Sequence, residues 1–389
     1  MAGTLEYIDQ FGGKSFAEVP FNDADNVLMC EIFYMPLERV VSESFDDEPV
    51  DFSKAANDLF AKMGYKYQKL GLMITKAASI KIMKMASQKR YSEMKLVAVK
   101  EVFESDPAVQ FAAGTFILPD GKLLVVFRGT DDSIIGWKED LDIYVRNGIP
   151  SYKLGVDYLE NLAEKYDGDI IVCGHSKGGN VALYSVLNSS EKVRSRVTAL
   201  YNNDGPGYHD YSVFQDGKYD DLLPKYRHIV PHSSFVGMLL AHDYDFTAVK
   251  STRHLGPIQH DMGTWQIENG ELVTKPDVDV LAKITDVALS NMLLNVTDAQ
   301  SAVVDFVGNE LIKGTSQVYL TEFAKNIVPS VKGAMQAWQN IEPKVREEFK
   351  GAFSGAGKII KNTVKNIKTE AIPQAAKNAS ILVRRVAAR

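Results

Sequence analysis

The chain has 389 residues, of which 45% are hydrophobic and 24% charged, the balance of an ordinary globular protein with a large core. Its net charge of -6 argues against nucleic acid as a partner for the whole chain. The two cysteines are too few for a disulfide framework. Because we find neither a signal peptide nor about 18 consecutive apolar residues, we expect a cytoplasmic protein without a membrane span.

Residues 1–105 are predicted to be a mostly helical region that packs on or caps the core. Apolar residues recur at helical spacing in residues 51–74, with Asp51 or Ser53 as the cap. Residues 91–104 show the same spacing, and we predict a second helix there. The region contains few sequence motifs that indicate catalytic or binding chemistry.

Strands and helices are predicted to alternate between residues 106 and 275, which form the expected catalytic core. Two apolar runs flank a Pro-Asp-Gly turn and predict a hairpin. Asn269-Gly270 predicts a second hairpin within residues 264–273. Helices are predicted over 151–166 and 178–188, and short buried strands over 169–174, 197–204, 226–230 and 244–251. This alternation predicts an α/β fold with a mostly parallel sheet flanked by helices.

In the C-terminal hundred residues the alternation of predicted strands and helices ends. Residues 276–356 are predicted to be a helical extension or a lid, and residues 51–105 are the other lid candidate. The tail 357–389 contains eight Lys and Arg residues against the single acid Glu370. Four of the lysines line one face of a predicted basic amphipathic helix. Such a face is either simply solvated or makes peripheral contact with an anionic membrane.

The motif GHSKG at residues 174–178 suggests a nucleophilic serine, Ser176. The pattern alone is weak, and a glycine-rich turn with a spectator serine is the alternative. Here a predicted buried strand precedes it and a predicted helix follows it, as a nucleophile elbow requires. Gly174 and Gly178 leave room for the strand and the helix to approach each other.

A serine nucleophile needs a base that is held by an acid. The best candidate base is His260, in a loop after a predicted strand, and His254 is its nearest rival. The best candidate acid is Asp204, because it follows a predicted strand, and ligand chemistry in open α/β sheets gathers at such strand ends. Asp243 and Asp245 are alternatives.

An oxyanion hole needs two donors. One is the backbone N–H after the nucleophile, from Lys177. The other is expected from an early strand end, where Thr130 follows the strong strand pattern of residues 122–129. We find no metal-ligand spacing and expect no cofactor.

These motifs resemble those of class 3 (fungal-type) lipases, which have the α/β-hydrolase fold. FRGT and the following Trp137 and Asp140 resemble two elements of that family, and Thr130 matches its oxyanion position. The strand–elbow–helix around Ser176 and the loop of His260 match as well. The combination with NDGPG and QHDMGTW more closely resembles a bacterial lipase-like family related to the class 3 lipases. The resemblance covers residues 110–275.

Two positions depart from the class 3 pattern. Ser234 falls where that family carries its triad acid, so the acid has moved or been lost. Asp204 resembles the acid that some pancreatic-type lipases carry after the preceding strand. Lys177 stands where lipases carry an apolar or uncharged residue. Its cation either favours an anionic substrate, such as a phospholipid headgroup or an acyl carrier, or points to solvent.

The sequence therefore predicts a serine ester hydrolase of the lipase/esterase type. It would act on acyl esters, lipids or phospholipids among them, through an acyl-enzyme. Activity should fall below about pH 6, because the base must be a neutral imidazole. The alternative is an inactive hydrolase-fold module that binds a membrane surface or a partner through its basic tail.

Overall fold

The computed structural model describes residues 3–64, 76–131, 133–146, 148–209, 211–215, 217–242, 245–254, 256–280, 282–283 and 343. The tail predicted over residues 357–389 lies outside these ranges. So does nearly all of the extension predicted over residues 276–356. In the part of the chain that is described, no helix combines the length and the apolar character needed to cross a membrane.

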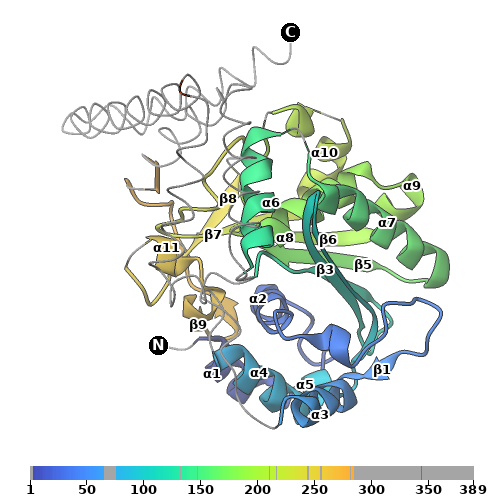
Figure 1. The fold of residues 1–389 in the computed structure, drawn as a ribbon. Helices are drawn as coiled ribbons and strands as arrows, with labels where there is room; N and C mark the ends of the chain where they lie inside the picture. Colours follow the sequence, from blue (N-terminus) through green and yellow to red (C-terminus); the bar gives the residue numbers. More distant parts are fainter. Residues whose placement is uncertain are drawn as a thin grey trace.

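A mixed sheet of nine strands runs through the molecule (Figure 1). The strand order is β1-β2-β3-β4-β5-β6-β7-β8-β11, and the five strands from β4 to β8 are parallel. The remaining pairs are antiparallel. The strands are β1 (Val50–Asp51), β2 (Lys95–Ser105), β3 (Ala108–Ile117), β4 (Leu123–Phe127), β5 (Ile170–His175), β6 (Val197–Asn203), β7 (Tyr226–Pro231), β8 (Phe246–Val249) and β11 (Thr274–Lys275).

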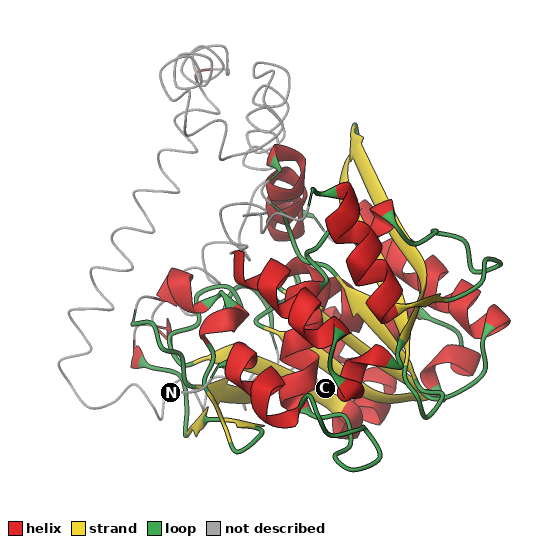
Figure 2. Ribbon diagram, turned by 90° about the horizontal axis from the view of Figure 1, so that it is seen from below, coloured by secondary structure: helices red, strands yellow, loops and turns green. Residues whose placement is uncertain are grey.

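Helices cover both faces of this sheet (Figures 1 and 2). Successive residues of a strand point to opposite faces, so β4 sends Leu124 and Val126 into one core, and Val125 and Phe127 into the other. Helices α1 (Thr4–Phe11), α2 (Asp23–Ile32), α3 (Phe52–Lys62), α4 (Lys76–Ala86) and α5 (Lys89–Ser92) contribute to the first core. Helices α7 (Pro150–Lys165) and α8 (Lys177–Asn188) contribute to the second.

Most predicted elements of residues 106–275 are confirmed. β3 and β4 form the antiparallel hairpin predicted around Pro-Asp-Gly. The strands and helices expected between residues 151 and 251 correspond to α7, β5, α8, β6, β7 and β8. The predicted Asn269-Gly270 hairpin pairs β9 (Ile267–Glu268) with β10 (Glu271–Leu272), and both turn residues have positive φ. The predicted alternation of strand and helix is therefore correct.

The helix predicted over residues 91–104 is wrong, because most of this segment is the strand β2. A β-bulge breaks the register between Val97 and Lys100, and Ala98 within it has a φ of 51°. The bulge sends Leu96 and Val99 into the same core although they are three residues apart. That spacing imitates a helix, and it misled the interpretation of the sequence.

The parallel strands bring the predicted functional residues to one edge of the sheet. Thr130 follows β4, Ser176 follows β5 and Asp204 follows β6. Because the carboxyl ends of parallel strands meet at one edge, residues far apart in the chain become neighbours there. Helix α6 (Ile134–Val145) follows Thr130, and α9 (Glu191–Arg194), α10 (Gly217–Leu222) and α11 (Gly256–Gln259) are short helices further along the chain.

Candidate active site

Ser176 occupies a sharp, strained turn between β5 and α8. Its φ of 56° and ψ of -132° lie in a region that residues with a side chain rarely adopt. A Cβ on Gly174 would lie 2.2 Å from the carbonyl oxygen of Gly178. A Cβ on Gly178 would lie 2.2 Å from the carbonyl oxygen of Phe127 in β4. The two glycines of the motif are therefore required by close backbone contacts.

His260 and Asp204 form a buried pair. The Nδ1 atom of His260 lies 2.7 Å from Oδ2 of Asp204, and the two residues are 6% and 0% exposed. His254 is exposed, and so is Asp245. Asp243 lies outside the described residues. The structure thus brings together the acid and the base that the sequence favoured.

Asp204 is held by two further donors on its other oxygen. Oδ1 accepts hydrogen bonds from the Ser234 hydroxyl at 2.5 Å and from the Gly237 backbone N–H at 3.0 Å. Burial alone would raise the pKa of Asp204, but the hydrogen bonds and charge of His260 and the bond from Ser234 more than offset it. The pKa therefore lies below its usual value. Ser234, at the position where class 3 lipases carry an acid, here supports Asp204.

The ionised Asp204 fixes the tautomer of His260. A carboxylate accepts hydrogen bonds only, so Nδ1 of His260 must donate its hydrogen to Asp204. When the imidazole is neutral, its Nε2 atom then carries a lone pair. A lone pair on that nitrogen is what a general base needs to accept the proton of a nucleophile.

Ser176 lies beside this pair without being bonded to it. The ring of His175, the preceding residue, lies 4.4 Å from that of His260 between centroids, at an interplanar angle of 33°. A Cβ on Gly205, the residue after Asp204, would lie 2.7 Å from the carbonyl oxygen of Ser176. The half-buried Ser176 hydroxyl makes no hydrogen bond to a described residue. Such bonds often form only when the substrate is bound.

His175 connects the N-terminal region to the loop of His260. Its Nε2 atom lies 2.9 Å from the carbonyl oxygen of His260, and its Nδ1 atom lies 2.8 Å from the hydroxyl of Tyr34. Burial lowers the pKa of His175 to about 3, so the ring is neutral. A carbonyl can only accept, so Nε2 donates to it, and Tyr34 donates to Nδ1. The sequence carried no signal for Tyr34, which is 141 residues away.

Thr130 is fixed by an acid on α6. Its hydroxyl donates a hydrogen bond of 2.7 Å to Oδ1 of Asp140. Burial raises the pKa of Asp140 to about 6. Ser133 caps the start of α6 by accepting a hydrogen bond from the Gly136 N–H at 3.0 Å. Among the described residues, the backbone N–H of Thr130 has no acceptor, so it is left for an oxyanion.

Lys177 is the first residue of α8. The N–H groups of Gly179 and Asn180 donate to the carbonyl of Ser176, whereas the N–H of Lys177 has no acceptor among the described residues. The first N–H groups of a helix are the natural donors to a negative charge. The backbone of Lys177 thus has the free N–H that its predicted role requires.

Both interpretations of the Lys177 side chain are wrong. The residue is only 1% exposed, so its ammonium neither reaches solvent nor offers a cation to a substrate. Instead, Nζ donates to Oε2 of Glu139 at 2.7 Å, to the carbonyl of Gln110 at 2.6 Å and to Oε1 of Gln110 at 2.9 Å. The charge is neutralised inside the protein. Its partners lie 38 and 67 positions away in the chain, and no local pattern indicated them.

The acids of this region are already occupied. Asp204 is bonded to His260, Glu139 to Lys177 and Asp140 to Thr130. Among the described residues, no group of three or more His, Cys, Asp or Glu side chains is arranged to hold a metal ion.

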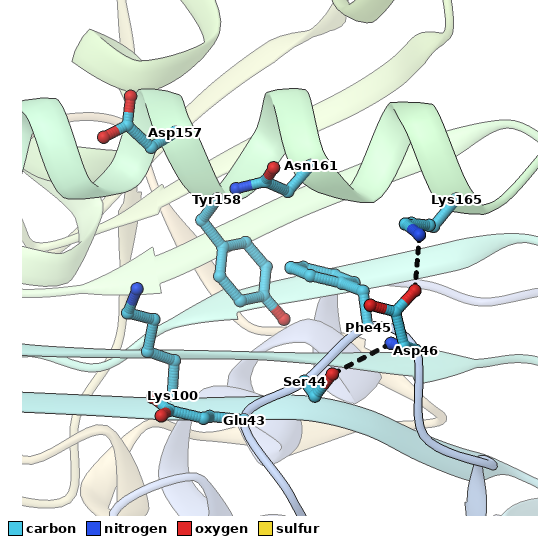
Figure 3. Close-up of a pocket in the computed structure, with 9 residues that line it drawn as sticks. All are labelled: Glu43, Ser44, Phe45, Asp46, Lys100, Asp157, Tyr158, Asn161 and Lys165. Carbon is cyan, nitrogen blue, oxygen red and sulfur yellow. Dashed lines mark hydrogen bonds and ion pairs between the residues drawn. The ribbon is translucent and has the colours of Figure 1, made fainter.

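A separate hollow of about 190 Å³ lies between α7, β2 and the loop before β1 (Figure 3). It is smaller than the roughly 300–1,000 Å³ typical of a ligand pocket. Lys165 and Asp46 form an ion pair at its side, as Figure 3 shows. No residue of the candidate site lines it. We therefore do not assign it to the candidate chemistry.

The mixed sheet flanked by helices, with its parallel strands β4 to β8 and a strained serine turn after β5, defines an α/β-hydrolase (lipase-like) fold. More particularly, the chain belongs to the Mbeg1-like family, a lipase-like family whose model matches residues 85–307, more than half of its length. The predicted resemblance is confirmed. Membership of this family supports a hydrolase of the lipase type in general.

Comparison with solved structures finds lipases. The M37 lipase is 15% identical with a TM-score of 0.34, and the match covers 55% of this chain and 68% of that one. A deletion mutant of the Rhizomucor miehei lipase with its propeptide is 16% identical with a TM-score of 0.34, over 62% and 76%. A fungal lipase–inhibitor complex is 18% identical with a TM-score of 0.31, over 60% and 90%. Similarities this loose carry no argument about activity. Among curated protein sequences there is no match.

Proposed function

We propose that the protein is a serine ester hydrolase of the lipase/esterase type. The observation that carries this proposal is the buried hydrogen bond between His260 and the ionised Asp204, beside the strained turn of Ser176. A spectator serine in a glycine-rich turn would need neither the strain nor the oriented histidine. The same bond argues against the inactive module, which was suggested by the displaced acid.

In the proposed mechanism, the Ser176 hydroxyl attacks the acyl carbonyl of the ester and transfers its proton to Nε2 of His260. The backbone N–H groups of Thr130 and Lys177 stabilise the resulting oxyanion. When the intermediate collapses, His260 returns the proton to the leaving alcohol, and the acyl group remains on Ser176. Water then attacks the acyl-enzyme by the same steps and releases the carboxylic acid.

The substrate proposed is an ester with an apolar acyl chain. Large apolar side chains near the candidate site are exposed to solvent, at 39% for Trp137 and 42% for Leu141 on α6, and at 48% for Ile258 just before His260. Phe235, next to Ser234, is 38% exposed. Exposed apolar side chains on the elements that carry the candidate site favour an apolar substrate there. Lipids and phospholipids are therefore among the candidate substrates.

Covalent labelling by a fluorophosphonate probe tests the nucleophile. Wild type should be labelled and should hydrolyse a series of chromogenic esters of increasing chain length, whereas Ser176→Ala should do neither. Asp204→Asn should stay folded but lose most turnover, roughly 10⁴-fold if the loss follows the known effect on the tautomer. The proposal fails if wild type is not labelled, or if Ser176→Ala is labelled equally.

A further inference from the structure

The proposed mechanism gives no role to the buried ion pair between the side chains of Lys177 and Glu139. The two residues are 1% and 0% exposed. The three hydrogens of the ammonium are matched by three acceptors, one on Glu139 and two on Gln110 in β3. A cation this well satisfied is held in one position. It is also the side chain of the residue whose backbone N–H follows the nucleophile.

Glu139 ties this cation to three elements of the fold. Its Oε2 also accepts from the Gln110 N–H at 3.0 Å. Its Oε1 accepts from the Ser151 hydroxyl at 2.6 Å and from the Ser151 N–H at 3.2 Å, at the start of α7. The carboxylate of α6 therefore joins β3, α7 and the first residue of α8. No part of this network faces solvent, because Gln110 and Ser151 are also fully buried.

Glu139 and Asp140 are neighbours in α6, and each holds a different residue of the oxyanion site. Glu139 holds Lys177, and Asp140 holds Thr130 by a hydrogen bond of 2.7 Å. The middle of α6 therefore connects the two residues whose backbone N–H groups were assigned to the oxyanion. Donors to an oxyanion must be placed within a few tenths of an ångström to be effective.

We propose that Lys177 and Glu139 are positioning residues, and that their buried pair sets the spacing between the backbone N–H groups of Lys177 and Thr130. This inference rests on the proposed hydrolase function. A buried ion pair often adds little stability compared with apolar side chains of the same size, so stability alone gives no reason for it. A requirement for fixed geometry at the oxyanion gives such a reason for the buried pair.

Lys177→Met tests the inference, because methionine keeps the apolar stem and removes the charge. Glu139 keeps its three other donors, so the variant should fold. The oxyanion donors interact more strongly with the transition state than with the neutral carbonyl of the bound ester, so their displacement should affect ester binding little. We therefore expect KM for a chromogenic ester to stay within about twofold, and kcat to fall roughly 10- to 100-fold. The affinity of a short alkyl boronic acid, which forms a tetrahedral anion on a nucleophilic serine, should fall by the same factor as kcat/KM.

Lys138→Met is the matched control. Lys138 is a buried lysine of the same helix, and it pairs with Asp142 at 2.9 Å. In this variant Asp142 keeps its hydrogen bond of 3.1 Å from Arg146, just as Glu139 keeps its other donors in Lys177→Met. We expect Lys138→Met to keep kcat and the boronic acid affinity. If Lys177→Met does not fold, Lys177→Met/Glu139→Gln removes both charges of this pair and should show the same loss of kcat.

Three results would overturn the inference. The first is that Lys177→Met, or the double variant, retains wild-type kcat and boronic acid affinity. The second is that Lys138→Met loses as much activity as Lys177→Met, which would indicate a general loosening of α6. A wild type that neither hydrolyses esters nor reacts with the fluorophosphonate overturns the proposed function, and the inference with it. The first two results overturn the inference alone.

Discussion

At the scale of single residues, His175 shows how burial converts a titratable group into a fixed one. Its ring bridges Tyr34 and the backbone of His260, and it can do so in only one tautomer. A proton on Nδ1 would turn the acceptor of the Tyr34 hydroxyl into a donor. The neutral form is therefore part of the structure of the site.

This arrangement predicts a dependence of stability on pH. The folded protein binds no proton at His175 until about pH 3, whereas an unfolded histidine binds one near pH 6.5. Between these values the unfolded chain holds more protons, so stability is fully present above about pH 6.5 and is lost as the pH falls. The contribution of this residue should change by about 1.4 kcal/mol per pH unit in that window.

Urea unfolding of wild type and His175→Gln at pH 7, 6, 5 and 4 measures this contribution. Glutamine can donate to one partner and accept from the other, but it does not titrate. The difference in free energy of unfolding between the two proteins should therefore shrink on acidification. The exposed His254, replaced in the same way, is the control. Parallel curves for wild type and His175→Gln would contradict the prediction.

Residues of the site differ in how far the sequence could indicate them. The elbow around Ser176 and the strand-end position of Asp204 have local signals, because glycines, a buried strand and a helix lie within a few residues of them. Tyr34 and Glu139 have no such signal, because only the folded chain brings them to His175 and Lys177. The side-chain direction of Lys177 was mispredicted for the same reason.

At the scale of elements, the site depends on how closely α8 approaches the sheet. Gly178 lies in the first turn of α8, against the backbone of β4. β4 is paired on both sides, with β3 and with β5, and cannot move away. The small residues of the elbow thus determine the distance between the helix and the strand.

Gly178→Ala should lower the free energy of unfolding by at least about 2 kcal/mol, because its Cβ would lie 2.2 Å from the carbonyl oxygen of Phe127. Chemical denaturation monitored by circular dichroism measures the change. Gly13→Ala is a matched control, since a Cβ there would have no atom within 4 Å. A Gly178→Ala protein within about 0.5 kcal/mol of wild type would show that the elbow can relax.

Elements with regular periodicity could be predicted, and the irregular one could not. The buried parallel strands β5 and β6 lie in apolar runs between turn residues, which is a reliable signal. β2 was mispredicted because its bulge at Ala98 shifts the alternation by one residue. A bulge depends on the pairing with β3, which the sequence of β2 alone does not contain.

At the scale of the whole molecule, the first hundred residues are built into the sheet and the site. β2 pairs with β3 from Lys95 opposite Ile117 to Ser105 opposite Ala108. Asn26 of α2 exchanges two hydrogen bonds, of 2.8 and 3.0 Å, with Asn203 at the end of β6. Tyr34 reaches His175. The N-terminal region is therefore a structural part of the core that the sequence placed after residue 105.

A fragment that begins at residue 106 should not fold. It would expose the first core of the sheet to water and leave the ten residues of β3 without a partner on one side. We expect an insoluble or aggregated fragment, without the cooperative unfolding of the full chain, by size-exclusion chromatography and circular dichroism. Addition of a fragment of residues 1–105 during refolding should recover soluble protein. A monomeric, cooperatively folded fragment would refute this expectation.

The two shortest strands of the sheet have a consequence for contacts between molecules. β1 and β11, at the two edges, have two residues each, Val50–Asp51 and Thr274–Lys275. An exposed strand edge recruits strands from other chains in proportion to the unpaired N–H and C=O groups that it offers. β1 covers only Lys95 and Leu96 of β2, so among the described residues the rest of that side of β2 is an edge that pairs with no strand. Lys100, Glu101 and Glu104 place charges along this edge, and charged side chains there discourage growth into fibres.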